Sequence, residues 1–289
     1  MNFPDYFADA DSNFNDSEYV IFGIPYDKTS SFRLGANLAP DKIRFSSWNF
    51  ETYNFKNKVD FKDIRVHDFG NILLKKDSSN EVINKVKTYT LSLLKNKKFP
   101  IALGGDHSIT AGIIQAFSDE IAVLSLDAHL DYRDIYENEK YNHACVIRRI
   151  SEKINIDNIA ILGIRSAEKR EFLEAKKDKL FWVDSYDIHK NGIKQALKKI
   201  KNKFKDKKIY LTLDIDVLDP SFASGTSTPE PFGISPFDIL ECIEFFSQDI
   251  IGFDVMEVCP PYDHGETAIL AARFVKTVIE ETWLKKYMD

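Results

Sequence analysis

Residues 121–131 read IAVLSLDAHLD, a short apolar run followed at once by two aspartates and a histidine at alternating positions. An apolar run of this length, bounded by polar residues, is typical of a strand that is buried on both faces. The run therefore predicts a buried strand, and the polar residues predict a cluster of Asp127, His129 and Asp131 at its carboxyl end.

The same alternation of apolar runs and amphipathic segments continues along the chain. Seven further apolar runs predict strands, over residues 19–24, 64–66, 99–103, 159–164, 180–183, 209–215 and 250–255. Segments with helical spacing of apolar residues predict helices over residues 40–48, 79–97, 167–177, 186–203, 235–247 and 266–286. Strands that alternate with helices indicate an α/β fold with three α/β/α layers and a mostly parallel sheet of about eight strands.

Length and composition limit the classes of protein to which the chain can belong. The 289 residues contain no internal repeat and no linker, so we expect residues 1–289 to form a single domain. The net charge of -6 and the pI near 5.6 argue against nucleic acid as a partner, because phosphate binding requires a basic face. An acidic balance suits a site for cations.

Features that would send the chain out of the cytoplasm are missing from the sequence. The first 19 residues are polar and acidic, unlike a signal peptide, and no apolar run approaches the roughly 18 residues of a membrane span. Cys145, Cys242 and Cys259 are far apart and form no paired motif, which argues against a disulfide framework and a thiolate zinc site. We therefore expect a cytoplasmic protein with no membrane partner.

Two more polar clusters follow predicted strands. Residues 104–108 read GGDHS after one strand, and residues 214–216 read DID at the end of another. Either cluster alone is compatible with a turn or a helix cap. In residues 127–131, however, side chains at i, i+2 and i+4 of an extended backbone point to one side, so three ligand-type groups converge. Open α/β sheets bind ligands at the carboxyl ends of their strands.

Four carboxylates and two imidazoles gathered at that edge would destabilise one another unless cations neutralised them. Aspartate and histidine donors without thiolate favour Mn²⁺ over structural zinc. Six protein ligands are too many for one catalytic ion with an open position, and they suit two ions about 3.5–4 Å apart that share a water. The implied chemistry is hydrolysis.

The three motifs GGDHS, LDAHLD and LDIDVLDP, in this order, resemble the metal-binding signatures of the ureohydrolase family of arginases and agmatinases. The resemblance covers nearly the whole chain and includes GIPYDKTSSFRLGAN at residues 23–37. It also includes FASGTSTPEPFG at residues 222–233 and DVMEVCPPYDHGETAILAA at residues 254–272, both more similar to agmatinases. It implies an arginase-like fold and two Mn²⁺ ions per subunit.

The resemblance also assigns the metal ligands. One ion would be bound by His107, Asp127, Asp131 and Asp214, and the other by Asp127, His129, Asp214 and Asp216. Asp127 and Asp214 would then bridge the two ions. Guanidinium is a poor electrophile that keeps its proton at neutral pH, so the implied nucleophile is a metal-bridging hydroxide.

Three residues match catalytic positions of the family. Asp131 would contact the hydroxide and pass its proton to the departing amine. Glu257 would pair with the substrate guanidinium, since a carboxylate matches the two parallel N–H groups. His143, in a loop after the second cluster, would bind the leaving group or exchange protons with solvent. Cys145, beside it, is expected to be a buried, inert thiol.

The substrate is indicated by the residues after Asp131. Arginases resemble one another in an asparagine two residues past this cluster, whereas here Tyr132 and Arg133 follow. This points to agmatine, hydrolysed to putrescine and urea in polyamine biosynthesis, rather than to arginine. N1-aminopropylagmatine and guanidinobutyrate are alternatives, and Arg133 would then serve an acidic tail or form a structural ion pair.

Other functions remain open on the same residues. A formiminoglutamate hydrolase or a related amide deacetylase would share the fold but would release no urea. A metal-binding regulatory protein would bind the ions without turnover. The resemblance further implies a homo-oligomer, a trimer or hexamer, whose small-molecule partner is a guanidino amine.

Overall fold

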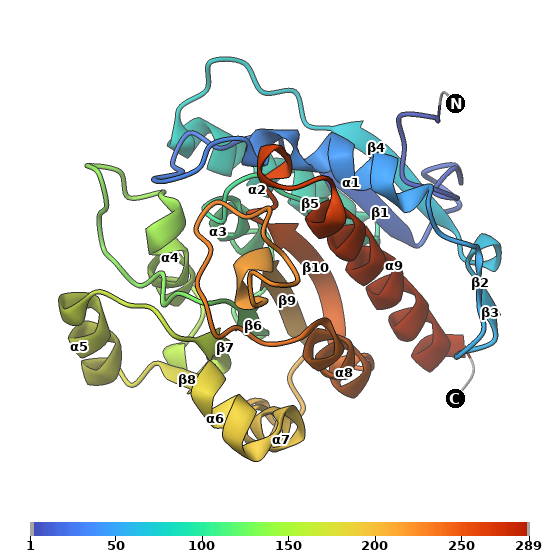
Figure 1. Ribbon diagram of the computed structural model, residues 1–289. Helices are drawn as coiled ribbons and strands as arrows, with labels where there is room; N and C mark the ends of the chain where they lie inside the picture. Colours follow the sequence, from blue (N-terminus) through green and yellow to red (C-terminus); the bar gives the residue numbers. More distant parts are fainter. Residues whose placement is uncertain (1–2, 288–289) are drawn as a thin grey trace.

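Eight parallel strands form the central sheet of the computed structural model, which describes residues 3–287 (Figure 1). Each neighbouring pair in this sheet is parallel. From one edge to the other the strands are β4 (Val66–Asn71), β1 (Tyr19–Gly23), β5 (Phe99–Leu103), β10 (Ile250–Met256), β9 (Ile209–Asp214), β6 (Ala122–Leu126), β7 (Ile159–Ile164) and β8 (Phe181–Asp184).

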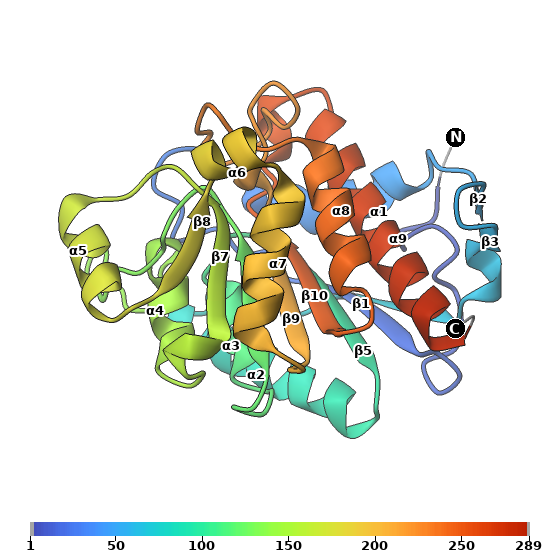
Figure 2. The same ribbon diagram turned by 90° about the horizontal axis from the view of Figure 1, so that it is seen from below.

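Helices cover both faces of the sheet. In Figure 2, α7 (Ile193–Phe204), α8 (Pro236–Phe246) and α9 (Glu266–Tyr287) lie in front of the strands, with α1 (Ala39–Ser47) packed against α9. The opposite face carries α2 (Ser79–Lys95), α3 (Ile109–Ile114) and α4 (Val146–Ser151). The predicted three-layer α/β/α fold is therefore confirmed, and the sheet is parallel throughout.

Apolar side chains that point alternately to the two faces of the sheet explain why helices cover both faces. On β1, Tyr19 and Ile21 belong to the core under α1, α8 and α9, whereas Val20 and Phe22 belong to the core under α2 and α3. Successive side chains of a strand point to opposite faces, so an unbroken apolar run buries residues in both cores. Burial of one such side chain contributes roughly 1.5–3 kcal/mol.

One predicted strand is displaced. The apolar residues 64–66 only precede or begin β4, which continues through His67, Asp68 and Asn71. Because β4 is the edge strand of this sheet, with only an isolated bridge between His67 and Asp11 on its outer side, its polar residues need not enter an apolar core. Asp68 instead accepts hydrogen bonds at 2.7 and 2.9 Å from Arg44 of α1.

The predicted helix over residues 186–203 is two helices, α6 (Ser185–Asn191) and α7, separated at Gly192. Gly192 has φ +81°, a left-handed conformation that ends a helix. Neither α3 nor α4, six residues each, is predicted from the sequence, and nor is the hairpin of β2 (Tyr53–Asn54) and β3 (Val59–Asp60). All six residues of α3 are buried, so no amphipathic period marks it.

Among residues 3–287, no helix is both long enough and apolar enough to span a membrane. The division into domains stays a prediction, and the first and last two residues of the predicted range 1–289 lie outside the described residues.

Candidate metal centre and reaction cavity

Four neighbouring strands carry the candidate site at their carboxyl ends. In the sheet, β5, β10, β9 and β6 lie side by side. Their last residues and the segments that follow hold, in the same order, residues 104–108, Glu257, residues 214–216 and residues 127–131. His107 and Glu257, for example, are 150 residues apart in the chain, but the strand order brings them to the same end of the sheet. This is the edge at which open α/β sheets bind ligands.

His107 stands at the centre of the first group of ligand-type side chains. Its Nδ1 lies 3.1 Å from Oδ2 of Asp127, 3.4 Å from Oδ2 of Asp131 and 3.2 Å from Oδ2 of Asp214. All four residues are buried. The four residues predicted for one metal ion are thus brought together by the fold.

His129 stands at the centre of the second group. Its Nδ1 lies 3.0 Å from Oδ2 of Asp216 and 3.8 Å from Oδ1 of Asp127. Asp127 therefore directs one oxygen to each histidine and joins the two groups. In the part of the chain that the structure describes, two sets have donor atoms close enough to share an ion: His107, Asp127 and Asp214, and Asp127, His129 and Asp216.

The backbone of residues 127–131 differs from the expected extended strand. A bridge to Ser166 keeps the chain beside its neighbour as far as His129, but Asp131 is left-handed, with φ +47°. The three side chains still converge, so strand alternation does not account for the position of Asp131.

The donor set fits divalent cations. Burial raises the pKa of Asp127 to about 7, and burial together with the charges of Asp216 and Asp127 raises the pKa of Asp214. Burial lowers the pKa of His107, but the three carboxylates around it outweigh that effect and hold the pKa well above its usual value. The protein alone thus retains protons here, and His107 Nδ1 and Asp127 Oδ2 both lack a hydrogen bond. A cation between such atoms would satisfy both.

A buried network that the sequence analysis missed orients His107. Its Nε2 lies 3.0 Å from the Thr212 hydroxyl, which donates a 2.6 Å hydrogen bond to Asp254 of β10. Contacts of this kind fix the orientation of a ligand histidine. The only sign in the sequence is a carboxylate within the apolar run of residues 250–256.

Arg165, also missed, holds the loop after β9. It donates hydrogen bonds to the backbone carbonyls of Asp216 at 2.6 Å and Val217 at 3.1 Å. The Asp216 carboxylate itself accepts from the Thr228 hydroxyl at 3.2 Å. Burial raises the pKa of Asp216, but His129 opposes it and the pKa falls to about 2. This carboxylate stays ionised.

Glu257 faces the same region from the end of β10. Its Oε1 accepts a 2.7 Å hydrogen bond from the backbone N–H of His107, and its own N–H donates to the carbonyl of Gly105 at 2.8 Å. Oε2 has no hydrogen-bond partner, and burial raises the pKa of the carboxyl to about 7. Gly105 is required, because a Cβ there would lie 1.7 Å from the carbonyl oxygen of Tyr26.

His143 lies at the side of the site on a chain of polar contacts. Its backbone N–H donates to the Thr29 hydroxyl at 3.0 Å, and Thr29 in turn donates to Asp106 at 2.9 Å. Its Nε2 lies 3.3 Å from the Ser31 hydroxyl, while Nδ1 has no partner. Cys145 is fully buried, and burial raises the pKa of its thiol to about 12.

A cavity of about 190 Å³ joins these groups. Its walls include Asp131, Asp214, Glu257, His143, Arg133 and Glu171. The three residues that the sequence predicts as catalytic therefore line the same space as His129 and Asp214, two further predicted metal ligands. The arrangement can bind a small cationic molecule beside a metal pair.

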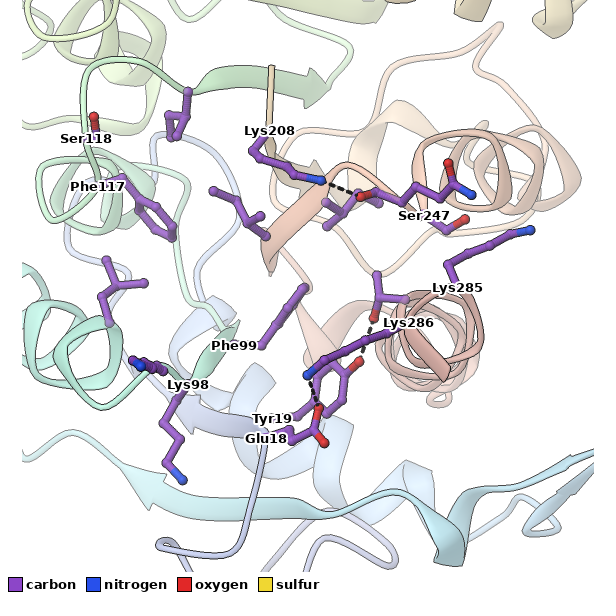
Figure 3. Close-up of a pocket in the computed structure, with 17 residues that line it drawn as sticks. Glu18, Tyr19, Lys98, Phe99, Phe117, Ser118, Lys208, Ser247, Lys285 and Lys286 are labelled. Atoms are coloured by element: carbon purple, nitrogen blue, oxygen red, sulfur yellow. Dashed lines mark hydrogen bonds and ion pairs between the residues drawn. The ribbon is translucent and has the colours of Figure 1, made fainter. Parts of the chain in front are cut away.

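A larger cavity, of about 750 Å³, lies at the amino ends of β1, β5 and β10, away from the metal cluster; Figure 3 shows its lining side chains. Its charged side chains are mostly lysines. The Lys286 amine pairs with Glu18 at 2.7 Å, and the Lys98 amine donates to the carbonyls of Asn15 and Ser17. Among its lining residues Glu18 is the one carboxylate, and none is a histidine. This cavity therefore lacks the donors of a metal site.

Comparison with known proteins gives a consistent picture. The sequence model of the arginase family matches residues 17–280. An agmatinase of Bacillus anthracis is 33% identical over 94% of each chain. An N(1)-aminopropylagmatine ureohydrolase of Thermococcus kodakarensis is 35% identical over 90% of this chain and 88% of its own. The crystal structure of agmatine ureohydrolase of Thermoplasma volcanium superposes on this chain with a TM-score of 0.94 and 36% sequence identity. The superposition covers 100% of this chain and 97% of that structure's chain.

Proposed function

The chain belongs to the arginase family, and from this we propose that it hydrolyses agmatine to putrescine and urea with two manganese ions per subunit. It is a hydrolase that acts on guanidino carbon–nitrogen bonds. One observation carries the proposal: the free Oε2 of buried Glu257 shares a cavity with a buried cluster of aspartates and histidines. That cavity pairs a guanidinium acceptor with a metal centre.

One ion would be bound by His107, Asp127, Asp131 and Asp214. The second ion would be bound by Asp127, His129, Asp214 and Asp216. Oxygen and imidazole donors without thiolate support manganese. When bound, two divalent ions supply hydroxide near neutral pH and stabilise developing negative charge.

The chain's own residues bind the substrate and move protons. Glu257 accepts N–H bonds from the guanidinium and fixes its planar face toward the cluster. Asp131, at the border between cluster and cavity, would accept the proton that the attacking hydroxide still carries and give it to the departing amine. His143 exchanges protons with solvent at the cavity wall, and Thr29 and Asp106 hold its backbone in place.

N(1)-aminopropylagmatine is the second candidate substrate. The Thermococcus relative that carries this name supports it, and so does a second cavity of about 440 Å³ that adjoins the first. Guanidinobutyrate is the third candidate substrate, because the Arg133 cation lines both cavities and could pair with its carboxylate tail.

Two further properties belong to the proposal. Exposed aromatic side chains support a homo-oligomer, since Phe55 and Phe237 are 86% and 77% exposed beside one apolar hollow. Buried, unpaired Cys145, Cys242 and Cys259 support a reducing compartment, the cytoplasm.

The proposed function is tested by urea release from agmatine, N(1)-aminopropylagmatine, guanidinobutyrate and arginine, assayed in parallel with manganese-loaded protein. We expect agmatine to give the highest kcat/KM and arginine the lowest. Protein from which a chelator has removed the metal serves as the blank. Absence of urea from all four compounds, with metal bound, would rule out the proposal and leave amide substrates to be tried.

A further inference from the structure

The reaction cavity adjoins a second, outer cavity. The inner one, of about 190 Å³, is lined by three of the predicted metal ligands, His129, Asp131 and Asp214, and the outer one measures about 440 Å³. Four residues line both spaces: Arg133, Tyr136, Glu168 and Glu171. The inner cavity is smaller than the roughly 300–1,000 Å³ of most ligand sites. The shared wall therefore limits how long a substrate can be.

Arg133 is the loosely held part of this wall. Its Nε lies 3.5 Å from Oε2 of Glu171 and makes no hydrogen bond, and its side chain is 32% exposed. The guanidinium carbon lies 4.5 Å from the centre of the Tyr136 ring. Arg149, in contrast, pairs with Asp134 at 2.6 Å and is buried. The Arg133 side chain is therefore held by one long ion pair and one ring contact, without the short ion pair and the burial that hold Arg149.

Glu171, its partner, is fixed. Oε1 accepts a 2.7 Å hydrogen bond from the backbone N–H of Tyr132, and Oε2 accepts a 3.3 Å hydrogen bond from the backbone N–H of Glu168. Glu171 is 5% exposed and belongs to the first turn of α5 (Lys169–Lys177). Movement at this wall would therefore involve Arg133 and leave Glu171 in place.

The outer cavity is lined by more carboxylates than cations, and the excess grows once Arg133 is removed. Its carboxylates are Asp134, Glu168, Glu171 and Glu174, against Arg133 and Arg170. Arg170 already pairs with Glu174 at 3.0 Å. Without the Arg133 guanidinium, four carboxylates face one cation of this lining, and of the four only Asp134 has a further arginine partner, Arg149. A substrate tail with additional ammonium groups would restore the balance.

We propose that Arg133 is a specificity-determining residue that closes the inner cavity against long cationic tails. The inference rests on the proposed ureohydrolase function. A short guanidino amine fits inside the wall, whereas a guanidino polyamine must displace Arg133 from Glu171 to reach the outer cavity. An acidic tail is attracted by the same guanidinium.

The test replaces Arg133 by methionine, which keeps a long flexible stem and removes the charge. Urea release gives kcat/KM for agmatine, N(1)-aminopropylagmatine and guanidinobutyrate with manganese-loaded protein. We expect the ratio of aminopropylagmatine to agmatine to rise on the order of tenfold, and the ratio of guanidinobutyrate to agmatine to fall. Arg133→Lys, which keeps the charge, should change both ratios less.

Arg148→Met is the matched control. Arg148 also forms an ion pair, with Asp178 at 3.1 Å, and lies 4.9 Å from the Tyr132 ring, but it lines neither cavity. Its ratios should equal those of the wild type. If Arg133→Met hydrolyses agmatine with both ratios within twofold of wild type, the inference is wrong while the proposed function stands. If wild-type protein releases no urea from any compound, the proposed function itself fails.

Discussion

Asp127→Asn is expected to lower urea release at least about a thousandfold and to leave fewer than two metal ions bound per chain. Asp127 is fully buried and directs one oxygen to each histidine of the cluster. Asparagine keeps the shape but offers one neutral oxygen in place of two charged ones. Loss of a residue that only supports a ligand costs about 10–100-fold, so loss of the shared ligand should cost more. Bound metal is measured by elemental analysis and urea by a colorimetric assay.

Asp178→Asn is the control for this variant, because the Asp178 carboxylate accepts from Tyr132 and Arg148 away from the cluster. It should bind two ions and retain activity. An Asp127→Asn protein with two tightly bound ions and wild-type turnover would show that the cluster is not the metal centre.

Glu257→Gln is expected to lower kcat/KM for agmatine by about 10²–10³-fold while the protein still binds two metal ions. Unpairing a buried, hydrogen-bonded charge costs roughly 2–5 kcal/mol, and each 1.4 kcal/mol corresponds to a factor of ten. Glutamine still accepts the bond from the His107 N–H at Oε1, but it presents an NH₂ group where Oε2 would accept from the guanidinium. Steady-state kinetics and metal content are measured on the same preparation.

Glu280→Gln provides a buried glutamate for comparison. Glu280 is fully buried in α9, accepts from Asn54 at 2.7 Å and lies outside the reaction cavity. Its replacement should leave kcat/KM unchanged even if it lowers the melting temperature. Equal activity of Glu257→Gln and wild type would assign the guanidinium to another group.

Local patterns in the sequence predict most of the sheet because burial on both faces leaves unbroken apolar runs. The pattern fails at β4, where an edge strand tolerates His67 and Asp68, and at α3, where complete burial removes the helical period. The pattern also fails at Gly192, where the predicted helix is divided into α6 and α7. An isolated glycine can lie within a helix, and the sequence does not show that this one has a positive φ. These failures arise where tertiary position, rather than local preference, decides the structure.

The candidate site could be predicted from motif order and resemblance, and the structure brings every predicted ligand to one edge. Strand order is what the spacing does not contain: β10 lies between β5 and β9, which places Glu257 beside His107. The supporting residues Thr212, Asp254 and Arg165 were missed for the same reason, because they act through hydrogen bonds between strands and loops distant in sequence.

Metal binding should also depend on pH. The pKa of Asp127 is raised to about 7 by burial, and the pKa of Asp214 is raised as well, so metal must displace protons from these carboxylates. Apparent affinity therefore falls as the pH falls below about 7. Binding of Mn²⁺ is therefore best measured near pH 8, where Asp127 has lost its proton.

The most direct measurement titrates metal-free protein with Mn²⁺ at pH 8 and follows bound metal and urea release from agmatine in the same samples. The proposed dimetal ureohydrolase predicts that both curves saturate at two ions per chain, and that Asp127→Asn releases almost no urea at any metal concentration. Full activity without metal, or two bound ions with no urea from agmatine or any other guanidino compound of the series, would contradict it.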